Sequence, residues 1–352
     1  MNNQYKYRRN RIVHAIVIIL VFMFFSLISG CKPNDSTTKI RIGWQVSWAT
    51  QAQIALTLKH TDILKQHGLK GDFFGFTYGA PLSEAALSGR IDVGFAADQP
   101  VASLIAAGGK FKIVARLMYF RGGIIVPTTS EIKNLYDLKG KTLAVPFGST
   151  THRIVLGMLE DAGLSPQRDL NIINIDIAEQ AGIVMSGTDD KWKGDIDALG
   201  SWDPNIAVFL NRNLARVLNE EFGLAVMYMS EDFINKNQDA SVRFIMAYIE
   251  SYYFYVSNTE QTNQWFVDEA RIEFEPSILD MVASFEPNFY AESINDINVI
   301  FNENDFAMME AGIEFGLNQG IIKIKPDIKA SVDTSLLIEA MDKFKKNENY
   351  QK

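Results

Sequence analysis

Three consecutive hydroxyl residues in the sequence Gly148-Ser149-Thr150-Thr151-His152 stand where a protein chain can bind an anion. Residues 141–145 before them have the composition of a strand, and apolar residues from Ile154 onward recur at helical spacing. The first N–H groups of a helix lack intrahelical partners and lie at its positive dipole end, so hydroxyls there favour an anion site. The alternative is that Ser149 or Thr150 only caps the helix.

Further polar and aromatic residues follow other predicted strands, where ligands bind in open α/β sheets. Each has a simpler alternative: packing for the tryptophans, N-capping for Asp98 and, with Pro204, for Asp203, and a solvated loop for Arg121. For His152 we favour packing or hydrogen bonding at the helix terminus over a general-base role, because no nucleophile accompanies it. The full set of predicted ligand-binding residues is Trp44, Gln45, Trp48, Asp98, Gln99, Arg121, Gly148, Ser149, Thr150, Thr151, His152, Trp202 and Asp203.

The amino terminus has the features of a secretory signal. Four basic residues precede an apolar stretch at residues 12–28, and small residues lead into Cys31 in Leu27-Ile28-Ser29-Gly30-Cys31. This ending resembles the bacterial lipobox, which predicts a signal peptide at 1–30, lipid attachment at Cys31 and a polar tether at 31–38. The alternative is a membrane anchor helix with an incidental cysteine.

Composition excludes several classes of function. Cys31 is the only cysteine, so an intramolecular disulfide, a cysteine-based zinc site and an internal thiol nucleophile are excluded. The first 30 residues carry four of the 34 basic residues and none of the 42 acidic ones, which leaves a net charge of −12 for the rest. We therefore expect no nucleic-acid partner. We expect no metal or other cofactor either.

Strand and helix patterns alternate through the chain, which predicts an α/β fold with mainly parallel pairing. Residues 231–285 then change to an almost wholly helical pattern, followed by helices near 306–317 and 334–344. The sequence 88–94 is echoed at 193–200, since in both a helix ends at glycine and a strand begins with Ile-Asp. Together these patterns predict two similar lobes. We expect strands at 40–44, 70–77, 91–96, 111–118, 124–127, 141–145, 170–177, 196–200 and 224–230, and helices at 51–65, 81–87, 99–107 and 179–185.

The ordered motifs of the chain resemble the substrate-binding proteins of ABC importers for nitrate, sulfonates, taurine and thiamine-precursor pyrimidines. The resemblance spans about 300 residues, and its motifs are Ile42-Gly43-Trp44-Gln45, residues 87–94, residues 137–141 ahead of residues 148–152, and residues 194–198 ahead of Trp202-Asp203-Pro204.

The resemblance implies the two-lobed periplasmic-binding-protein (type II) fold, with the ligand in a cleft between the lobes. It implies crossings near 121–125 and 227–231, hence a first lobe from 39–123, a second lobe from 124–228, and a return to the first lobe with C-terminal helices at 229–344 before a polar tail at 345–352. It also implies an ABC permease and its ATPase as partners, with the chain held at the membrane through its N-terminal lipid, outside the cytoplasm.

The ligand that the residues favour is a small anion or zwitterion, above all a sulfonate such as taurine or an alkanesulfonate. If Asp98 or Asp203 faces the cleft, either would repel nitrate and bind the ammonium of taurine. The segment 148–152 also resembles the taurine and sulfonate branch, whereas residues 187–191 look like an insertion near the second-lobe site. The alternatives are nitrate-like oxyanions, a thiamine-precursor pyrimidine, a biosynthetic enzyme of the same fold and a sensory ectodomain.

Overall fold

The computed structural model describes residues 37–188, 190–271 and 275–346. The predicted signal peptide and Cys31 lie outside these residues. Within the described ranges, no helix has the length and apolar character that a membrane crossing requires.

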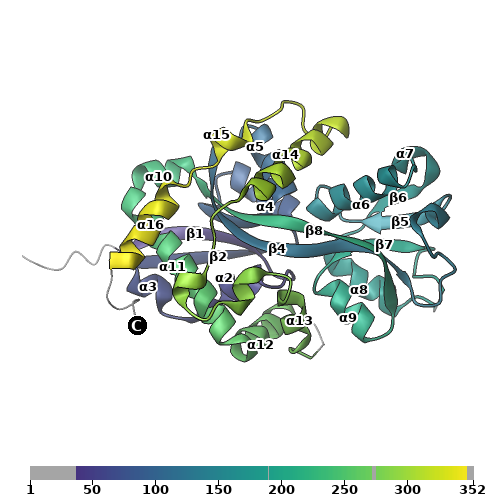
Figure 1. The fold of residues 1–352 in the computed structure, drawn as a ribbon, viewed down its shortest axis with the longest axis horizontal. Helices are drawn as coiled ribbons and strands as arrows, with labels where there is room; N and C mark the ends of the chain where they lie inside the picture. The colour runs from purple at the N-terminus through teal and green to yellow at the C-terminus, as the bar shows by residue number, and fades with distance from the viewer. Residues whose placement is uncertain (1–36, 189, 272–274, 347–352) are drawn as a thin grey trace, which may run out of the picture. The chain divides into compact units, whose positions relative to one another are not determined.

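Eight strands form one mixed sheet in the order β2-β1-β3-β8-β4-β7-β5-β6 (Figure 1). The β2-β1-β3 set and the β7-β5-β6 set are each parallel, as the strand–helix alternation predicts. The strands are β1 (Thr38–Gln45), β2 (Leu69–Phe76), β3 (Val93–Ala97), β4 (Phe111–Pro127), β5 (Thr142–Val145), β6 (Asn171–Asn174), β7 (Ala198–Trp202) and β8 (Ala215–Ser230).

Strands β4 and β8 pair antiparallel along their length and join the two parallel sets into one sheet (Figure 1). The prediction of separate strands at 111–118 and 124–127 is wrong, because β4 continues through Arg121-Gly122-Gly123. Opposite Arg121 in the register lies Phe222, and opposite Ile125 lies Val217. The residues that pair with the predicted first crossing at 121–125 are therefore 217–222, which come earlier in the chain than the predicted second crossing at 227–231. By Ala225 the chain already pairs with β3.

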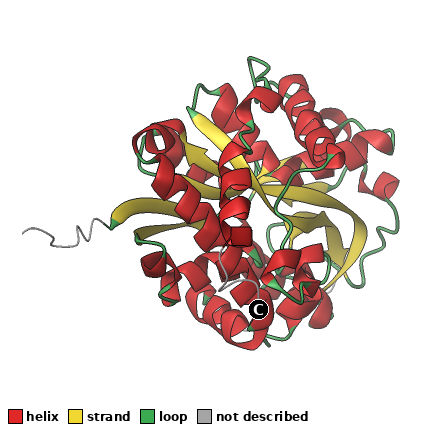
Figure 2. Ribbon diagram, turned by 60° about the vertical axis from the view of Figure 1, so that its left-hand side comes forward, coloured by secondary structure: helices red, strands yellow, loops and turns green. Residues whose placement is uncertain are grey.

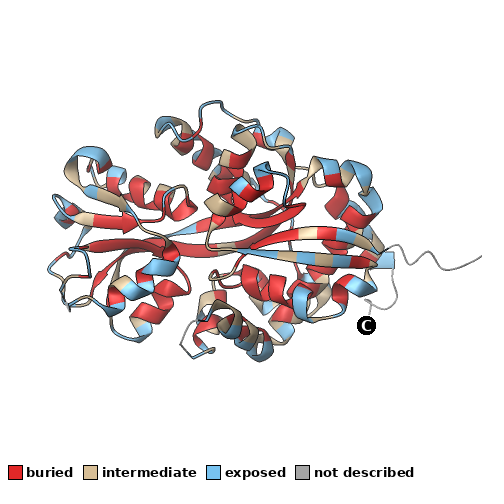
Figure 3. Cartoon of the chain, turned by 180° about the vertical axis from the view of Figure 1, so that it is seen from behind, coloured by how far each residue is buried: buried red, intermediate tan, exposed pale blue. Residues whose placement is uncertain are grey.

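Helices cover both faces of the sheet, and most strand residues are buried between them (Figures 2 and 3). The predicted helix at 51–65 is two helices, interrupted at Thr61-Asp62. The helices are α2 (Gln51–His60), α3 (Ile63–Gln66), α4 (Gly79–Leu87), α5 (Asp98–Ala106), α6 (Thr150–Asp161), α7 (Pro166–Asp169), α8 (Ile177–Met185), α9 (Asn205–Asn211), α10 (Glu231–Lys236), α11 (Gln238–Ser257), α12 (Thr259–Ala270), α13 (Ile278–Ala283), α14 (Glu303–Asn318), α15 (Ile328–Ser331) and α16 (Ser335–Lys346), with 3₁₀ turns at Leu135–Leu138, Pro287–Tyr290 and Ile294–Asp296.

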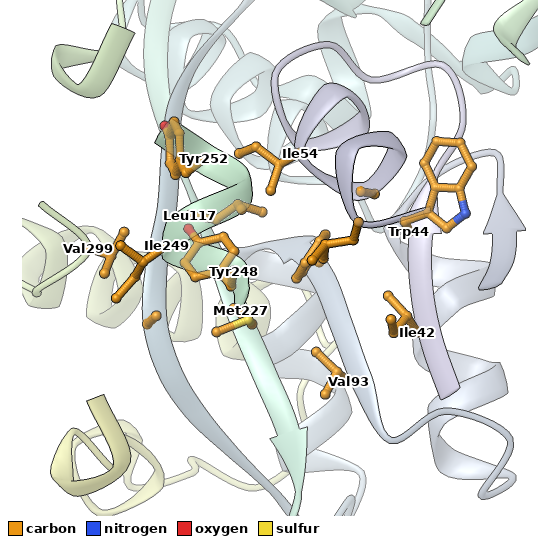
Figure 4. Close-up of a cluster of buried hydrophobic side chains, with 14 of the residues drawn as sticks. Ile42, Trp44, Ile54, Val93, Leu117, Met227, Tyr248, Ile249, Tyr252 and Val299 are labelled. Carbon is orange, nitrogen blue, oxygen red and sulfur yellow. The ribbon is translucent and has the colours of Figure 1, made fainter. Parts of the chain in front are cut away.

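The largest apolar core lies between the first strands and helices α2 and α11 (Figure 4). Alternate residues of β1, namely Ile40, Ile42 and Trp44, belong to this core because successive side chains of a strand point to opposite faces. The predominantly helical C-terminal third, α10 to α16, supplies Tyr248 and Tyr252 to the same core.

A buried ion pair ties the C-terminal third to the long strand β4. Arg116 on β4 binds the carboxylate of Glu286 through two nitrogens, at 2.8 and 2.9 Å, and the exposed fractions of the two side chains are 4% and 2%. Glu286 also accepts the backbone N–H of Tyr119 at 2.8 Å. The carboxylate is therefore fully paired, although both charges have lost their water.

Glu286→Gln is expected to lower the free energy of unfolding by about 3 kcal/mol or more, because Arg116 keeps a buried charge without its counter-ion. Urea denaturation measures this loss. Glu314→Gln is the matched control, since the Glu314–Lys325 pair is exposed and is expected to contribute less than about 1 kcal/mol. Equal losses in the two variants would contradict the assignment.

Candidate functional site

A small cavity of about 20 Å³, close to the space that one water molecule needs, lies where the carboxyl ends of strands from both parallel sets meet the sides of β4. Its lining comes from the segments that follow β1, β2, β3, β5 and β7, with one residue from β4. The lining residues are Gln45, Trp48, Tyr78, Gly79, Ala97, Pro100, Phe120, Ser149, Thr150, Thr151 and Trp202. Six predicted ligand-binding residues are therefore brought together: Gln45, Trp48, Ser149, Thr150, Thr151 and Trp202.

One side of the cavity is aromatic. Trp48 contacts Phe120 edge to face, with ring centroids 4.8 Å apart, and Tyr78 and Trp202 complete the aromatic set. Burial raises the pKa of Tyr78, with smaller contributions from the negative charges of Asp176 and Glu84, so its phenol stays neutral. No charged side chain is among the described residues that line the cavity.

The amino termini of three helices border the same cavity. Gly79 is the first residue of α4, Ala97 directly precedes α5, and Thr150 is the first residue of α6. The N-terminal end of a helix carries a partial positive charge and free N–H groups. The cavity thus combines positive helix ends with an aromatic wall.

The three hydroxyls of the sequence motif have three different roles. Ser149 caps α6: its oxygen accepts the N–H of His152 at 3.0 Å, and its hydroxyl donates to the carbonyl of Pro146 at 2.7 Å. The Thr150 hydroxyl donates to Asp98 at 2.6 Å. The Thr151 hydroxyl, among the described residues, is buried and has no hydrogen-bond partner. Of the three hydroxyls of the motif, only that of Thr151 is free.

A second donor at the cavity is free as well. The indole N–H of Trp202 is buried without a partner among the described residues. The backbone N–H groups of Thr150 and Thr151, in the first turn of α6, also have no acceptor in the described part of the chain. Four donors and the α6 dipole are thus available to an acceptor-rich group in the cavity.

Asp98 is not the N-cap of α5, because Ala97 occupies that position and Asp98 is the first helical residue. Its carboxylate accepts from Thr150 and from its neighbour Gln99 N–H at 2.8 Å, and it pairs with Arg153 at 3.0 Å. Gln99 is buried and lies beside α14, with its side-chain nitrogen 3.5 Å from the Ser103 hydroxyl. Neither residue lines the cavity, so both predicted cleft positions are corrected.

Arg121 and Asp203 bind each other instead of facing the cavity. Two guanidinium nitrogens of Arg121 donate to the two carboxylate oxygens of Asp203, each at 2.8 Å. Asp203 is not an N-cap either, because α9 begins at Asn205 with Pro204 as its cap, although the Asp203 carboxylate accepts the Ala207 N–H at 3.1 Å. Burial raises the pKa of Asp203, and the bonds from Arg121 oppose that rise.

Three other predicted residues have structural roles. Trp44 is a residue of β1, is 2% exposed and packs in the core, so the packing alternative is correct. Gly148 adopts a positive φ of 78° in the turn before α6, a conformation that favours glycine. His152 stacks on Phe147, with ring centroids 4.6 Å apart, and accepts the Gly148 N–H at 3.4 Å. None of the three lines the cavity.

The sequence analysis missed five lining residues. Tyr78 and Gly79 directly follow the strand predicted at 70–77, so the rule that ligands bind beyond strand ends was sufficient to find them. Ala97 and Pro100 flank the predicted pair Asp98 and Gln99 but carry no polar group that marks a site. Phe120 was missed because β4 was divided at that point.

The described residues of the suspected insertion, 187–188 and 190–191, do not line the cavity. The Lys191 ammonium lies 3.5 Å from Asp195 and 3.9 Å from Asp197, just before β7 begins. The cavity is at the other end of β7, where Trp202 lies.

Comparison with protein families gives a match over more than half of the chain. The model of the family described as NMT1/THI5-like matches residues 64–262. The chain is 22% identical over 339 residues to a protein of Bacillus subtilis (strain 168) provisionally named as aliphatic sulfonates-binding, which covers 93% of this chain and 96% of the relative. It is 27% identical over 227 residues to the taurine-binding periplasmic protein of Escherichia coli (strain K12), covering 61% and 67%.

Solved structures share the fold. The alkanesulfonate-binding protein SsuA from Xanthomonas axonopodis pv. citri, bound to MOPS, superposes with a TM-score of 0.69 at 20% identity, covering 84% of this chain and 98% of SsuA. The desulfurization enzyme DszB superposes with a TM-score of 0.64 at 14% identity, covering 87% and 99%. The fold is therefore that of the periplasmic binding proteins, as the sequence analysis predicted, and it is also found in an enzyme.

The stability of the folded chain has a testable dependence on pH through His152. Burial lowers the pKa of His152 from 6.5 to about 4. The unfolded chain therefore binds a proton at this histidine more readily than the folded chain does. As pH falls from about 6.5 to about 4, the free energy of unfolding is expected to fall by up to about 3 kcal/mol.

His152→Phe keeps the ring between Phe147 and Phe315 and removes the titration. The difference in unfolding free energy between pH 7 and pH 4.5, from urea denaturation, should be smaller in this variant than in the wild type. His60→Phe is the control, because His60 is exposed and is expected to alter that difference less. An unchanged pH dependence in His152→Phe would refute the assignment.

Proposed function

The chain belongs to the NMT1/THI5-like family, and on that premise we propose that it is the solute-binding component of an ABC importer. It captures a small sulfonate in the cavity by closure of its two halves and acts outside the cytoplasm. Residues 39–123 together with the chain after the second crossing form one lobe, and the chain between the crossings forms the other. The named binding-protein relatives support this proposal.

The observation that carries the proposal is the set of free donors beside the aromatic wall. The N–H groups of Thr150 and Thr151, the Thr151 hydroxyl and the Trp202 indole N–H lie at one cavity. A sulfonate offers only acceptor oxygens, so it matches this set. Hydrogen bonds to a charged group contribute roughly 1.5–3 kcal/mol each, and micromolar affinity needs about 8 kcal/mol. Four donors and the α6 dipole are sufficient.

The other end of the ligand is uncharged in this proposal, so an alkanesulfonate is favoured over taurine. The preference for taurine required a carboxylate facing the cleft, but Asp98 is paired with Arg153 and Asp203 with Arg121. A buried ammonium without a counter-ion costs several kcal/mol. A cation–π contact of the ammonium with Trp48 or Phe120 contributes only about 0.5–2 kcal/mol of binding free energy.

Two other ligand classes fit the cavity less well. Nitrate has oxygens that can accept from the donors, but it has no apolar group to contact the aromatic wall. A pyrimidine can stack on Trp48 or Trp202 but carries no anionic group for the α6 terminus. An enzyme of this fold remains the alternative of a different class, and recovery of the ligand without chemical change distinguishes a binder from it.

The membrane partners follow from the same proposal. A permease and its ATPase receive the ligand, and the lipid on Cys31 holds the chain at the membrane. Radiolabelled palmitate incorporation in a bacterial host tests the lipid. Loss of the label in Cys31→Ser, with the protein released from the membrane fraction, supports the lipid anchor, and a retained label contradicts it.

The ligand prediction is tested with a matched pair of compounds. 1-Propanesulfonate and taurine differ mainly in a terminal methyl against an ammonium group. Isothermal titration calorimetry of the purified protein should give at least tenfold tighter binding for 1-propanesulfonate, because no carboxylate is among the described lining residues to pair with the ammonium. Nitrate and an aminopyrimidine complete the panel. Tighter binding of taurine, or binding of the pyrimidine alone, would reject the proposed ligand class.

Thr151→Val removes the free hydroxyl and keeps the shape of the side chain. We expect 1-propanesulfonate to bind about 10- to 100-fold more weakly, since a hydrogen bond to a charged group contributes roughly 1.5–3 kcal/mol. Calorimetry measures the change. Thr128→Val is the control, because Thr128 lies after the end of β4 and donates to the Asn213 carbonyl instead. The role of Thr151 is disproved if the two variants bind equally well.

A further inference from the structure

Three helices meet at a buried polar junction next to the cavity. Helix α5 follows β3, α6 follows β5, and the C-terminal helix α14 packs against both. We name this the closure junction, and it consists of Asp98 and Gln99 on α5, Thr150 and Arg153 on α6, and Gly312 on α14. Because β3 and β5 lie on opposite sides of the β4–β8 pair, α5 and α6 belong to opposite halves of the sheet.

Contacts across the junction are short and buried. One Asp98 oxygen accepts the Thr150 hydroxyl at 2.6 Å, and the other accepts from the Arg153 guanidinium at 3.0 Å. The exposed fractions of the Asp98 and Arg153 side chains are 1% and 11%. The Gln99 N–H also lies 3.2 Å from the Thr150 oxygen. Separation of the two halves would return both charges to water.

Helix α14 covers this pair closely. A methyl group added at Gly312 would lie 3.2 Å from the Gln99 side-chain oxygen, 3.7 Å from Arg153 Nε and 3.8 Å from an Asp98 oxygen. The Gln99 oxygen and Arg153 Nε are buried without partners in the described part of the chain. The junction is therefore buried and closely packed by residues from all three helices.

We propose that Asp98 and Arg153 are positioning residues that form a closure latch, which rests on the proposed function of the cavity. Thr150 connects the latch to the ligand, since its hydroxyl binds Asp98 and the same residue lines the cavity. The latch pairs only on closure, so it slows release of the bound ligand. The pairing with Arg153 also neutralises Asp98, a carboxylate that would otherwise repel an anion in the adjacent cavity.

A simple electrostatic effect on the ligand makes a different prediction from a latch. If Asp98 and Arg153 acted only through their charge, Asp98→Asn would tighten binding of an anion and Arg153→Met would weaken it. In a latch, each single change leaves one buried charge without its partner. Both variants then destabilise the closed state. The two explanations are distinguished by the sign of the effect in Asp98→Asn.

Stopped-flow tryptophan fluorescence with 1-propanesulfonate provides the test, because Trp48 and Trp202 line the cavity. We expect Asp98→Asn and Arg153→Met each to raise the dissociation rate at least tenfold, with the association rate changed less than threefold. The double variant should release the ligand more slowly than the product of the single effects predicts, since it leaves no unpaired charge. Asp161→Asn and Arg90→Met, at exposed positions, are the matched controls.

Slower release from Asp98→Asn, or a change confined to the association rate, would overturn the latch. If the wild type does not bind 1-propanesulfonate, the proposed ligand fails, and the latch is tested without any ligand. Spin labels at Ser88→Cys and Met185→Cys, both exposed and in opposite halves, report the separation of the halves by double electron–electron resonance. The latch predicts a larger short-distance population in the wild type than in Arg153→Met, and identical distributions refute it.

Discussion

The antiparallel pairing of β4 with β8 is the constraint on which the cavity depends. It places the β2-β1-β3 set and the β7-β5-β6 set in one sheet, so segments from both sets meet beside β4 (Figure 1). Phe120 on β4 faces the cavity, whereas Arg121 is held by Asp203. A side chain at Gly122 would come within 3.0 Å of the Thr151 hydroxyl. Glycine there keeps the one free hydroxyl of the motif in place.

Charge pairing decides what the cavity can bind. Asp98 and Asp203 are each held by an arginine, and Glu286 is held by Arg116 farther along β4. Hydrogen-bond donors and the positive ends of helices therefore border the cavity, and no free carboxylate is among its described lining residues. This pairing makes the proposed anion site compatible with an acidic chain, because Asp98 and Asp203 already have arginine partners.

The sequence predicted the α/β fold well, and six of the predicted site residues line one cavity, because both follow from local patterns. Strand ends at Gln45, Val145 and Trp202 are marked by apolar runs followed by polar or aromatic residues, and all three lead into the cavity. The Arg121-Gly122-Gly123 sequence reads as a loop, since only pairing with distant β8 keeps it extended. Most differences between the predicted site and the cavity lining arise because the predicted residues bind partners that are distant in the sequence.

The roles within the hydroxyl motif illustrate that limit. Ser149, Thr150 and Thr151 are chemically similar, and spacing alone does not assign them. Ser149 turns back on its own helix, Thr150 reaches Asp98, 52 residues earlier in the chain, and Thr151 remains free. Each assignment depends on which element packs against α6. The motif thus supplies one capping residue, one residue that joins the two halves of the sheet and one residue with a free hydroxyl, the proposed ligand donor.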